Sequence, residues 1–569
     1  QRQNLIGILP INAPDVSVGR SGEWTIGVDF GTSFTNLHVS RSGARERLDL
    51  KTMALNITNK PENTSDNKNF FVPTSLIPEG HNPPMSTLLT IRGSSEPDST
   101  PKYMTNSRLY NPALDERSLP DYIISDIKWT NPKYLDAFLT TLVNLVSAHA
   151  AKNDVRKITW KASFPTAFSV SEVARYQQAW KRALNDASNV SGIKHHLGKD
   201  QSAKSAFQTE SIAFAQYFAD ELGEQLVFTT CLDIGGGTTD ISIWKDMELI
   251  HQLSIPFAGR DIFHQILKRN VNRVGDIFGL SEDKSIELLT DLKNSGDNFD
   301  AYLDSYLRLK GDNVLELLRN AGNTETIQGF RTLLALAYAG LYYYIGLVLK
   351  YLGQQQATPV YLGGNGSRFI NWIDPDGQYS ECSEINRLLS YVLAKAGEFD
   401  TQDTRDTVLS RYPKQEAAGG LIVEETRLKG LDLSSPEAYA GMPMVFECDT
   451  GTIRLTADQQ IKLPEQVQLI KRIAIDDFTE IGNFLDVFNE GIRTSGIRDI
   501  KPLKGLGITS DNILNDIKFD LTNEVKQMLN SKRAIGEGLS QNYEPDPGFI
   551  VAHKALLRIL SKQWSKNAG

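Results

Sequence analysis

Residues 226–244 read Leu226-Val-Phe-Thr-Thr-Cys-Leu-Asp-Ile-Gly-Gly-Gly-Thr-Thr-Asp-Ile-Ser-Ile-Trp244. An apolar run ends in Asp233, three glycines follow, and an alternating run continues from Asp240, which predicts a strand, a tight turn and a second strand. Glycine lets the backbone approach a ligand closely, and successive N–H groups in such a turn form a concavity that suits phosphate. A carboxylate at the strand end could hold a hydrated Mg²⁺ against the same phosphates. Taken alone, the stretch is equally an ordinary glycine-rich hairpin.

The same pattern recurs near the start of the chain. Trp24-Thr-Ile-Gly-Val-Asp-Phe-Gly-Thr-Ser-Phe-Thr-Asn-Leu-His-Val-Ser40 contains an apolar strand that ends in Asp29, a short Gly31-Thr32-Ser33 turn and a second alternating strand. Two such units far apart in one chain predict two related lobes that each present a phosphate loop to one nucleotide. A third stretch, Pro359-Val-Tyr-Leu-Gly-Gly-Asn-Gly-Ser-Arg-Phe369, is a short strand that ends in glycines, where the backbone could approach a flat ring or a sugar.

These three stretches, in this order, resemble the motifs of the actin-like ATPase superfamily, which includes actin, DnaK-type heat-shock chaperones, bacterial actin homologues, and sugar and acetate kinases. Residues 29–36 resemble its first phosphate motif, residues 233–240 its second, and residues 362–367 its adenosine motif. Asp-Ile-Gly-Gly-Gly-Thr-Thr-Asp is close to the DnaK-type form and is the most specific of the three. The resemblance implies an α/β fold of two duplicated βββαβα-type lobes, each with a small subdomain.

The resemblance also implies a ligand, ATP or ADP with Mg²⁺. In that reading Asp29 and Asp233 orient the hydrated metal through water. The residues that would cradle the phosphates are Gly31, Thr32, Ser33, Gly235, Gly236, Gly237 and Thr238, and those that would line the adenosine are Gly363, Gly364, Asn365 and Ser367.

Two further residues are implied to act in catalysis. Glu210 stands where DnaK-type proteins begin a helix with Glu-Pro-Thr-Ala-Ala, although Ser211 replaces the proline, and it would order the water that attacks the γ-phosphate. The alternative is that Glu210 caps the N-terminus of a helix, where a negative charge is favourable. Lys128 is the nearest match to a family lysine that reaches the terminal phosphates. An ordinary surface lysine is the alternative there.

The chain also departs from the DnaK-type pattern. Gln415 stands where the family has an acidic residue, and the family's Lys/Arg clamp on the purine has no clear counterpart. After Leu421 there is neither an apolar linker nor a clear run of β-sandwich strands. The pattern predicts two or three strands in Met442–Ile461, followed by helices in Asp476–Phe488, Asp511–Asn530 and Pro547–Gln563.

A chain of 569 residues is too long for one compact core, so several domains are expected. The motifs place an N-terminal arm at 1–22, lobe I at 23–225 with a small subdomain at about 43–120, lobe II at 226–430 with a mostly helical small subdomain at about 256–328, and a C-terminal module, mixed and then mostly helical, at 431–569.

The bulk composition excludes several classes of protein. The formal net charge of −9 argues against a nucleic-acid-binding face, and the three separated cysteines form neither a disulfide framework nor a metal site. The separated cysteines indicate a reducing compartment, and the protein is expected to be cytoplasmic. The uncharged run Thr332–Leu349 approaches the length of a membrane span, but its glycines and three consecutive tyrosines favour a buried core helix.

The sequence therefore predicts an ATP-binding, Mg²⁺-dependent ATPase with slow turnover. It would act as a nucleotide-driven, chaperone-like switch on a protein partner, bound through the C-terminal module or the small subdomains. A filament-forming actin-like protein and a metabolite kinase of the same fold are the alternatives, together with a scaffold that binds nucleotide without hydrolysing it. The kinase would need an aspartate base beside an acceptor pocket, and no kinase-type signature stands in the first lobe.

Overall fold

The structure is a computed structural model. It describes residues 21–50, 54–58, 71–75, 84–91, 107–109, 123–129, 131–200, 202–320, 324–374, 376–402, 405–431, 438–462, 464, 466–467, 469–497, 500, 503, 513–531 and 545–567. Two compact units emerge. The first unit comprises residues up to 208, and the second unit comprises residues 209–569 together with two short segments, 31–33 and 165–169.

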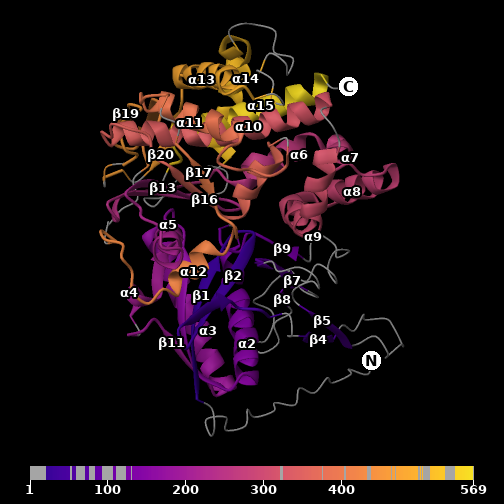
Figure 1. The fold of residues 1–569 in the computed structure, drawn as a ribbon, viewed down its shortest axis with the longest axis vertical. Helices are drawn as coiled ribbons and strands as arrows, with labels where there is room; N and C mark the ends of the chain where they lie inside the picture. The colour runs from indigo at the N-terminus through magenta and orange to yellow at the C-terminus, as the bar shows by residue number, and fades with distance from the viewer. Residues whose placement is uncertain are drawn as a thin grey trace. The chain divides into compact units, whose positions relative to one another are not determined.

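The first unit is built on a sheet with strand order β11-β10-β1-β2-β3 (Figure 1). Its strands are β1 (Gly22–Phe30), β2 (Phe34–Arg41), β3 (Ala44–Arg47), β10 (Val155–Phe164) and β11 (Lys194–Leu197). Strands β1, β2 and β3 form an antiparallel meander, whereas β10 and β11 continue the sheet in parallel from β1. The predicted strand–turn–strand at residues 24–40 is confirmed.

Two helices pack on this sheet through aromatic side chains. These are α2 (Leu135–Lys152), preceded by the 3-10 turn η4 (Pro132–Tyr134), and α3 (Val170–Ser191). The rings of Phe138 on α2 and Tyr176 on α3 lie 5.4 Å and 5.8 Å from the ring of Phe30 at the end of β1. The core of the first unit therefore forms where β1 approaches its glycine turn.

The remaining elements of the first unit are short. They are the pair β4 (Ala54–Thr58) and β5 (Phe71–Ser75), the sheet of β7 (Leu89–Ile91), β8 (Ser107–Leu109) and β9 (Ile123–Ile124), and β6 (Met85–Ser86), β12 (Phe207–Thr209) and α4 (Ala203–Ala206). Most of the small subdomain predicted at about 43–120, and nearly all of the arm at 1–22, lie outside the described residues.

The second unit repeats the sheet of the first. Its strand order is β15-β14-β13-β16-β17, with an antiparallel meander followed by two parallel strands. The strands are β13 (Phe228–Ile234), β14 (Thr239–Lys245), β15 (Glu248–Ile255), β16 (Val360–Gly363) and β17 (Thr407–Leu409). The expected strands on either side of the three glycines are thus confirmed.

The central helix of the second unit is α10 (Glu325–Tyr351), which is buried along almost its whole length. It is the helix among the described residues that is long and apolar enough to cross a membrane, yet its apolar window is entirely buried inside the protein. Its three consecutive tyrosines find partners there. The Tyr342 hydroxyl lies 2.8 Å from Thr407 Oγ1, Tyr343 donates to Glu480, and Tyr344 donates to the Tyr439 carbonyl at 2.7 Å. The prediction of a buried core helix is confirmed.

A helical region lies between β15 and α10, as predicted for residues 256–328. Its elements are the π-helix η6 (Arg260–His264), α6 (Gln265–Arg269), η7 (Val271–Arg273), α7 (Val274–Ile277), α8 (Glu282–Asn294), η8 (Gly296–Asn298) and α9 (Phe299–Asn320). The other helices of the second unit before the C-terminal part are α5 (Glu210–Gln216), the π-helix η5 (Tyr217–Glu221), the 3-10 helix η9 (Asn365–Trp372), α11 (Glu384–Ala396) and α12 (Glu416–Leu421).

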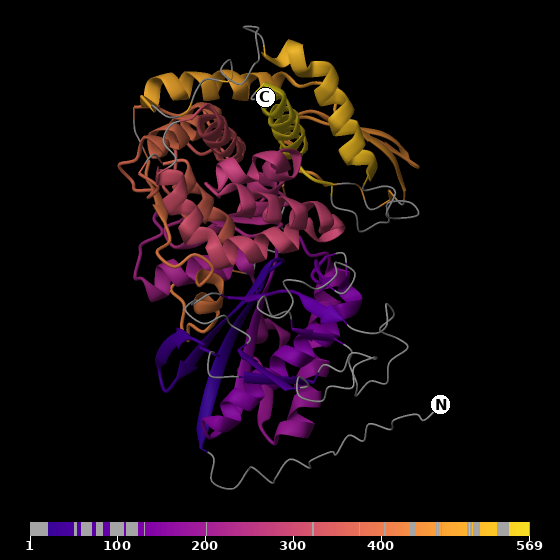
Figure 2. The ribbon, with the colours of Figure 1, turned by 90° about the vertical axis from the view of Figure 1, so that its right-hand side faces the viewer.

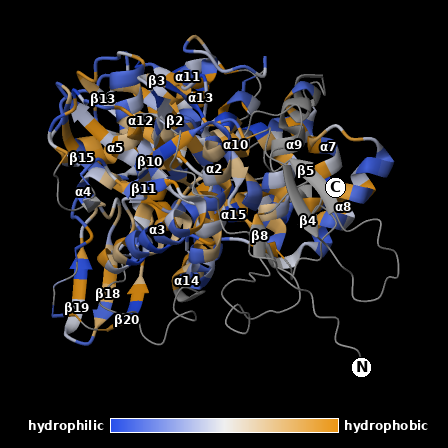
Figure 3. Cartoon of the chain, turned by 90° about the horizontal axis from the view of Figure 1, so that it is seen from below, coloured by the Kyte–Doolittle hydropathy of each residue, from blue (hydrophilic) through white to orange (hydrophobic). Residues whose placement is uncertain are grey.

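The C-terminal part contains a sheet of β18 (Met444–Cys448), β19 (Gly451–Leu455) and β20 (Ile470–Ala474), followed by α13 (Thr479–Ser495), α14 (Ile513–Ser531) and α15 (Gly548–Asn567). Buried and partly exposed residues alternate along β18, and the three strands carry both hydrophobic and hydrophilic residues (Figure 3). Helices α13 and α15 pack beside α10, and α14 packs on α15 (Figures 1 and 2). Because their buried side chains belong to the same hydrophobic core as α10 and β13, a separate C-terminal module is not confirmed.

Candidate functional site

The turn between β13 and β14 is the centre of the candidate site. Residues 235–238 connect the two strands, and the Gly235 N–H donates to the Thr238 carbonyl at 2.9 Å. The three glycines are partly exposed, whereas Asp233 and Thr238 on either side are buried. The tight turn therefore presents bare backbone to its surroundings.

A second glycine turn packs on the first within the same compact unit. A Cβ added to Gly236 would overlap Ser33 Oγ, and one added to Gly237 would lie 3.3 Å from Thr32 Oγ1. A side chain at either glycine would have to displace the hydroxyl that it meets. The buried Ser33 hydroxyl has no hydrogen-bond partner among the described residues, so it can donate to an oxygen-rich ligand lying over the two turns.

The third glycine segment closes over the end of β13. Gly364 has φ 76° and ψ 167°, a conformation that essentially only glycine adopts, and a Cβ there would overlap the Asp233 carboxylate. Tyr338 of α10 donates to the Gly366 carbonyl and fixes the segment from behind. Ser367 is fully buried and donates to the Gly364 carbonyl at 2.7 Å, so its hydroxyl stabilises the turn itself. Asn365 is partly exposed.

The two aspartates of the central hairpin lie opposite each other. Asp233 pairs with Asp240 across the antiparallel ladder and with Gly363 across the parallel one. The backbone N–H and the hydroxyl of Thr166 both donate to Asp240 Oδ1 at 3.1 Å. Asp240 thus holds the segment after β10 against β14, and Asp233 lies beside the glycines of the third segment.

Glu210 is the first residue of α5, and its side chain is 6% exposed. The residues on either side attach this helix end to the sheet, since the hydroxyls of Thr209 and Ser211 donate to Gln252 Oε1 of β15 at 3.2 and 3.1 Å. Ser242 of β14 also donates to the Ser211 carbonyl at 3.3 Å. The structure therefore places Glu210 in the same unit as Asp233 and the glycine turns.

Two predicted residues belong to the first unit. Asp29 is 1% exposed and pairs with Asn36 across the β1–β2 ladder. Lys128 lies in the turn after β9, behind Asp126, which has a φ of 53°. Its side chain is only 4% exposed, which does not fit the alternative of an ordinary surface lysine.

The two glycine hairpins have the same register. Asp29 pairs with Asn36 and Phe30 with Thr35, so that residues 31–34 form the turn. In the second unit Asp233 pairs with Asp240 and Ile234 with Thr239, which leaves residues 235–238. Each hairpin opens a sheet with the same strand order, and each sheet adds its parallel strands after a helix. The chain has the actin-like ATPase fold.

Two solved structures are similar to this chain at low sequence identity. A structure of the ethanolamine utilization protein EutJ from Carboxydothermus hydrogenoformans is 11% identical, with 73% of this chain and 91% of that chain covered and a TM-score of 0.28. A structure of the MamK double helical filament is 12% identical, with 70% and 97% covered and a TM-score of 0.32. Values this low add nothing about activity, so the assignment rests on the strand order and the hairpin register.

No protein-family model matches the chain. A search of curated proteins finds no match either.

A buried acid lies next to Gln415, the position that was compared with a family acidic residue. Gln415 precedes α12, whereas Glu416 begins it and is 1% exposed. Burial raises the pKa of Glu416 to about 7, although a hydrogen bond from Ser410 opposes the shift. A Cβ on Gly363 would lie 2.5 Å from Glu416 Oε1, so the acid lies directly behind the predicted adenosine segment.

Proposed function

We propose that the protein binds ATP with Mg²⁺, hydrolyses it slowly, and uses the nucleotide as a conformational switch on a protein partner. The observation that carries the proposal is the convergence of three glycine segments around the end of β13. At Gly236, Gly237 and Gly364, a Cβ would meet Ser33, Thr32 and Asp233 respectively. Backbone amides and a buried hydroxyl without a partner among the described residues suit the oxygens of a polyphosphate.

The residues present fit the magnesium nucleotide. Asp29 and Asp233 would hold the hydrated ion through its waters, because Mg²⁺ keeps several waters and takes one or two carboxylates together with phosphate oxygens. When bound, the ion would neutralise charge on the phosphates. Residues 31–33 and 235–238 would receive the phosphates, and residues 363–365 would receive the adenosine. Lys128 would add a positive charge at the terminal phosphates.

Glu210 would position the attacking water by accepting a hydrogen bond from it. In phosphoryl transfer the protein contributes chiefly by positioning and by electrostatic stabilisation, so a carboxylate with this task needs no unusual pKa. The bonds that Thr209 and Ser211 make to Gln252 support this role, since they fix the helix end that carries Glu210 to the same sheet as Asp233.

A nucleotide shifts a conformational equilibrium only by its different affinity for the two states. The chain offers a basis for such a difference, because the segments 31–33 and 165–169 are continuous in sequence with the first unit but pack with the second. Ligand bound at the glycine turns would act directly on these connections. A partner that recognises one arrangement of the units would then respond to the nucleotide.

The test is steady-state ATP hydrolysis with Mg²⁺, combined with calorimetric titration of ATP. Asp233→Asn is expected to lower both ATP affinity and turnover, whereas Glu210→Gln should keep affinity and lose about a hundredfold in turnover. Asp246→Asn is the matched control, because Asp246 lies in the β14–β15 turn with a φ of 50°, which asparagine also tolerates.

A parent protein that binds no adenine nucleotide would overturn the proposal. A parent that binds ATP but whose turnover is unaffected by Glu210→Gln would remove only the role of Glu210. Sedimentation with and without ATP would detect filament formation, and a phosphotransfer screen on small metabolites would detect a kinase.

A further inference from the structure

The segment after β15 is attached to the backbone of the glycine turn. The Gly259 N–H donates to the Gly235 carbonyl at 3.1 Å, and the Arg260 N–H donates to the Gly236 carbonyl at the same distance. A Cβ on Gly259 would lie 3.2 Å from the Gly235 oxygen, so the two segments are in close contact. The backbone of Arg260 is therefore fixed beside the turn that the proposed function assigns to phosphate.

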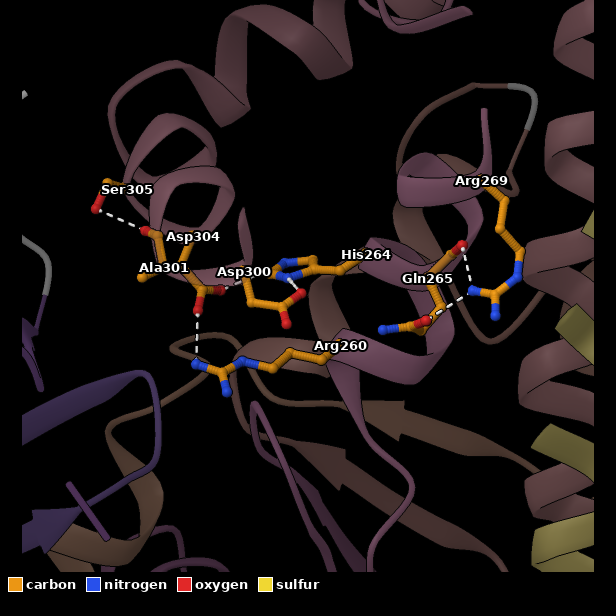
Figure 4. A network of polar contacts seen from close by, with 8 residues as sticks. All are labelled: Arg260, His264, Gln265, Arg269, Asp300, Ala301, Asp304 and Ser305. Atoms are coloured by element: carbon orange, nitrogen blue, oxygen red, sulfur yellow. Dashed lines mark hydrogen bonds and ion pairs between the residues drawn. The ribbon is translucent and has the colours of Figure 1, made fainter. Parts of the chain in front are cut away.

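The side chain of Arg260 extends toward α9 (Figure 4). Its Nη2 lies 3.5 Å from Asp304 Oδ2, and both side chains are mostly buried, at 13% and 15% exposed. A charge-assisted N–H···O bond is usually about 2.7–2.9 Å long, so this contact is longer than a typical one. Arginine prefers a planar, bidentate partner, and phosphate oxygens provide one.

Asp304 has a second partner besides Arg260. His264 lies between two carboxylates of α9, with Nδ1 3.0 Å from Asp300 Oδ1 and Nε2 3.4 Å from Asp304 Oδ1. Burial alone would raise the pKa of Asp300, but the His264 hydrogen bond and the positive charges of Arg260 and Lys268 hold that pKa below its ordinary value. His264 thus contacts both carboxylates of α9, whereas Arg260 contacts Asp304.

We propose that Arg260 is a phosphate-binding residue of this site. With nucleotide bound, the guanidinium moves from Asp304 and donates to the terminal phosphate oxygens, while Asp304 stays with His264. The inference rests on the proposed function, since it assigns a residue to the same site. Asp304 then competes with the phosphate for Arg260. Binding of the terminal phosphate would therefore change the contact between Arg260 and α9.

This competition makes a prediction that a purely structural ion pair does not. Removing either member of a structural pair destabilises the protein, so both changes would weaken ligand binding in the same direction. Under competition the two changes act oppositely, because loss of Arg260 removes a ligand contact and loss of the Asp304 charge releases Arg260 to the ligand.

The experiment is calorimetric titration of the full chain with Mg²⁺ and ATP, ADP or AMP. Arg260→Ala is expected to lower ATP affinity about tenfold or more and to leave AMP affinity nearly unchanged. Arg260→Lys keeps the positive charge but not the planar guanidinium, so it should lower ATP affinity by less than Arg260→Ala. Asp304→Asn should raise ATP affinity about twofold to fivefold. Arg472→Ala is the control, because Arg472 also pairs with a carboxylate, Glu447 at 2.9 Å, on an exposed part of the C-terminal sheet.

Thermal unfolding without nucleotide identifies any variant that fails to fold, and Arg260→Lys and Asp304→Asn then decide the question. The proposal is overturned if Asp304→Asn weakens ATP binding along with the Arg260 variants, or if all Arg260 variants bind ATP as the parent does. A parent that binds none of the three nucleotides overturns the proposed function and this inference with it. A parent that binds ATP without any help from Arg260 overturns only this inference.

Discussion

At the scale of single residues, Gly364 decides whether the third segment can close over β13. It combines a positive φ with a Cβ direction that points at Asp233 Oδ1 and the Ile234 carbonyl. The positive φ alone would cost a residue with a side chain roughly 1–3 kcal/mol of stability. A Cβ in that direction would push the segment away from the aspartate that is proposed to face the metal.

Gly364→Ala is therefore expected to lower both stability and nucleotide affinity. The matched control is Gly353→Ala, since Gly353 has a φ of 69° after α10 but nothing within 4 Å of its Cβ position. It should lose only the conformational cost of about 1–2 kcal/mol and keep nucleotide affinity. Urea unfolding and ATP titration of both variants separate the two effects. Equal losses in the two variants would contradict the close approach.

Residue-level prediction succeeded where the rules are local. The glycine turns after Asp29 and Asp233 were predictable because strand pattern and turn chemistry both depend on neighbours in sequence. Arg260 was missed because its partner Asp304 comes from another helix. Glu416 was missed because the packing of α12 on α5, and not the sequence, decides which of two adjacent residues points inward.

At the scale of elements, α10 and α15 pack through two glycines. A Cβ on Gly340 would overlap the ring of His553, and one on Gly329 would overlap Trp564. The two glycines are eleven residues apart, as are their two partners, and eleven residues make about three helical turns. Both contacts therefore lie along one stripe of each helix, which run in opposite directions.

Because of this close contact, a glycine-to-alanine change at Gly340 is expected to lower the stability of the protein, whereas the same change in a helix usually raises it. Helix propensity alone would make Gly340→Ala stabilising by up to about 1 kcal/mol, but the buried ring makes overpacking cost about 1–3 kcal/mol. Gly482→Ala in α13 is the control, since its Cβ would meet only the end of Leu514 at 3.1 Å. We expect a lower urea midpoint for the first variant and no loss for the second. His553→Ala should restore part of the loss, and a stabilised Gly340→Ala would disprove the close contact.

The sequence predicted where helices and strands form better than it predicted what they pack against. The three C-terminal helices begin inside the segments that periodicity indicated and extend past their C-terminal ends, and two of the three strands of β18–β20 lie within the predicted segment. That α15 completes the core around α10 could not be read from the sequence, because amphipathic periodicity says that a helix has a buried face but not what covers it.

At the scale of the whole molecule, two buried ionisable groups of the second unit have opposite effects on how its stability depends on pH. Burial lowers the pKa of His553 to about 3, so its contribution to stability is full above about 6.5, the unfolded value, and is lost as the pH falls. Glu416 acts in the opposite sense. Because its folded pKa is raised to about 7, its contribution is full below about 4.5 and is lost as the pH rises through 7. Between about pH 4.5 and 6.5 the two nearly cancel.

In the first unit, the buried His38 and the half-buried His195 affect the pH dependence of stability in the same direction. Burial lowers the pKa of His38 to about 4 and that of His195 to about 4, and Trp160 donates to His195 Nδ1 at 3.0 Å, which requires the neutral ring. Both contributions to stability are therefore lost as the pH falls below about 6.5. We expect acid to destabilise the first unit before the second.

Glu416→Gln tests the compensation directly. Without the glutamate, the second unit should lose stability as the pH falls from about 6.5 to 4.5, with a slope near 1.4 kcal/mol per pH unit, because His553 then titrates unopposed. Hydrogen exchange of the α10 amides measures the opening of that unit. Adding His553→Phe should make the stability of the second unit nearly independent of pH again in this range. The phenylalanine ring can occupy the place of the histidine ring beside Phe549. If Glu416→Gln leaves the slope unchanged, Glu416 is ionised in the folded protein and the buried acid behind Gly363 is a carboxylate, with its charge available to the nucleotide side of the sheet.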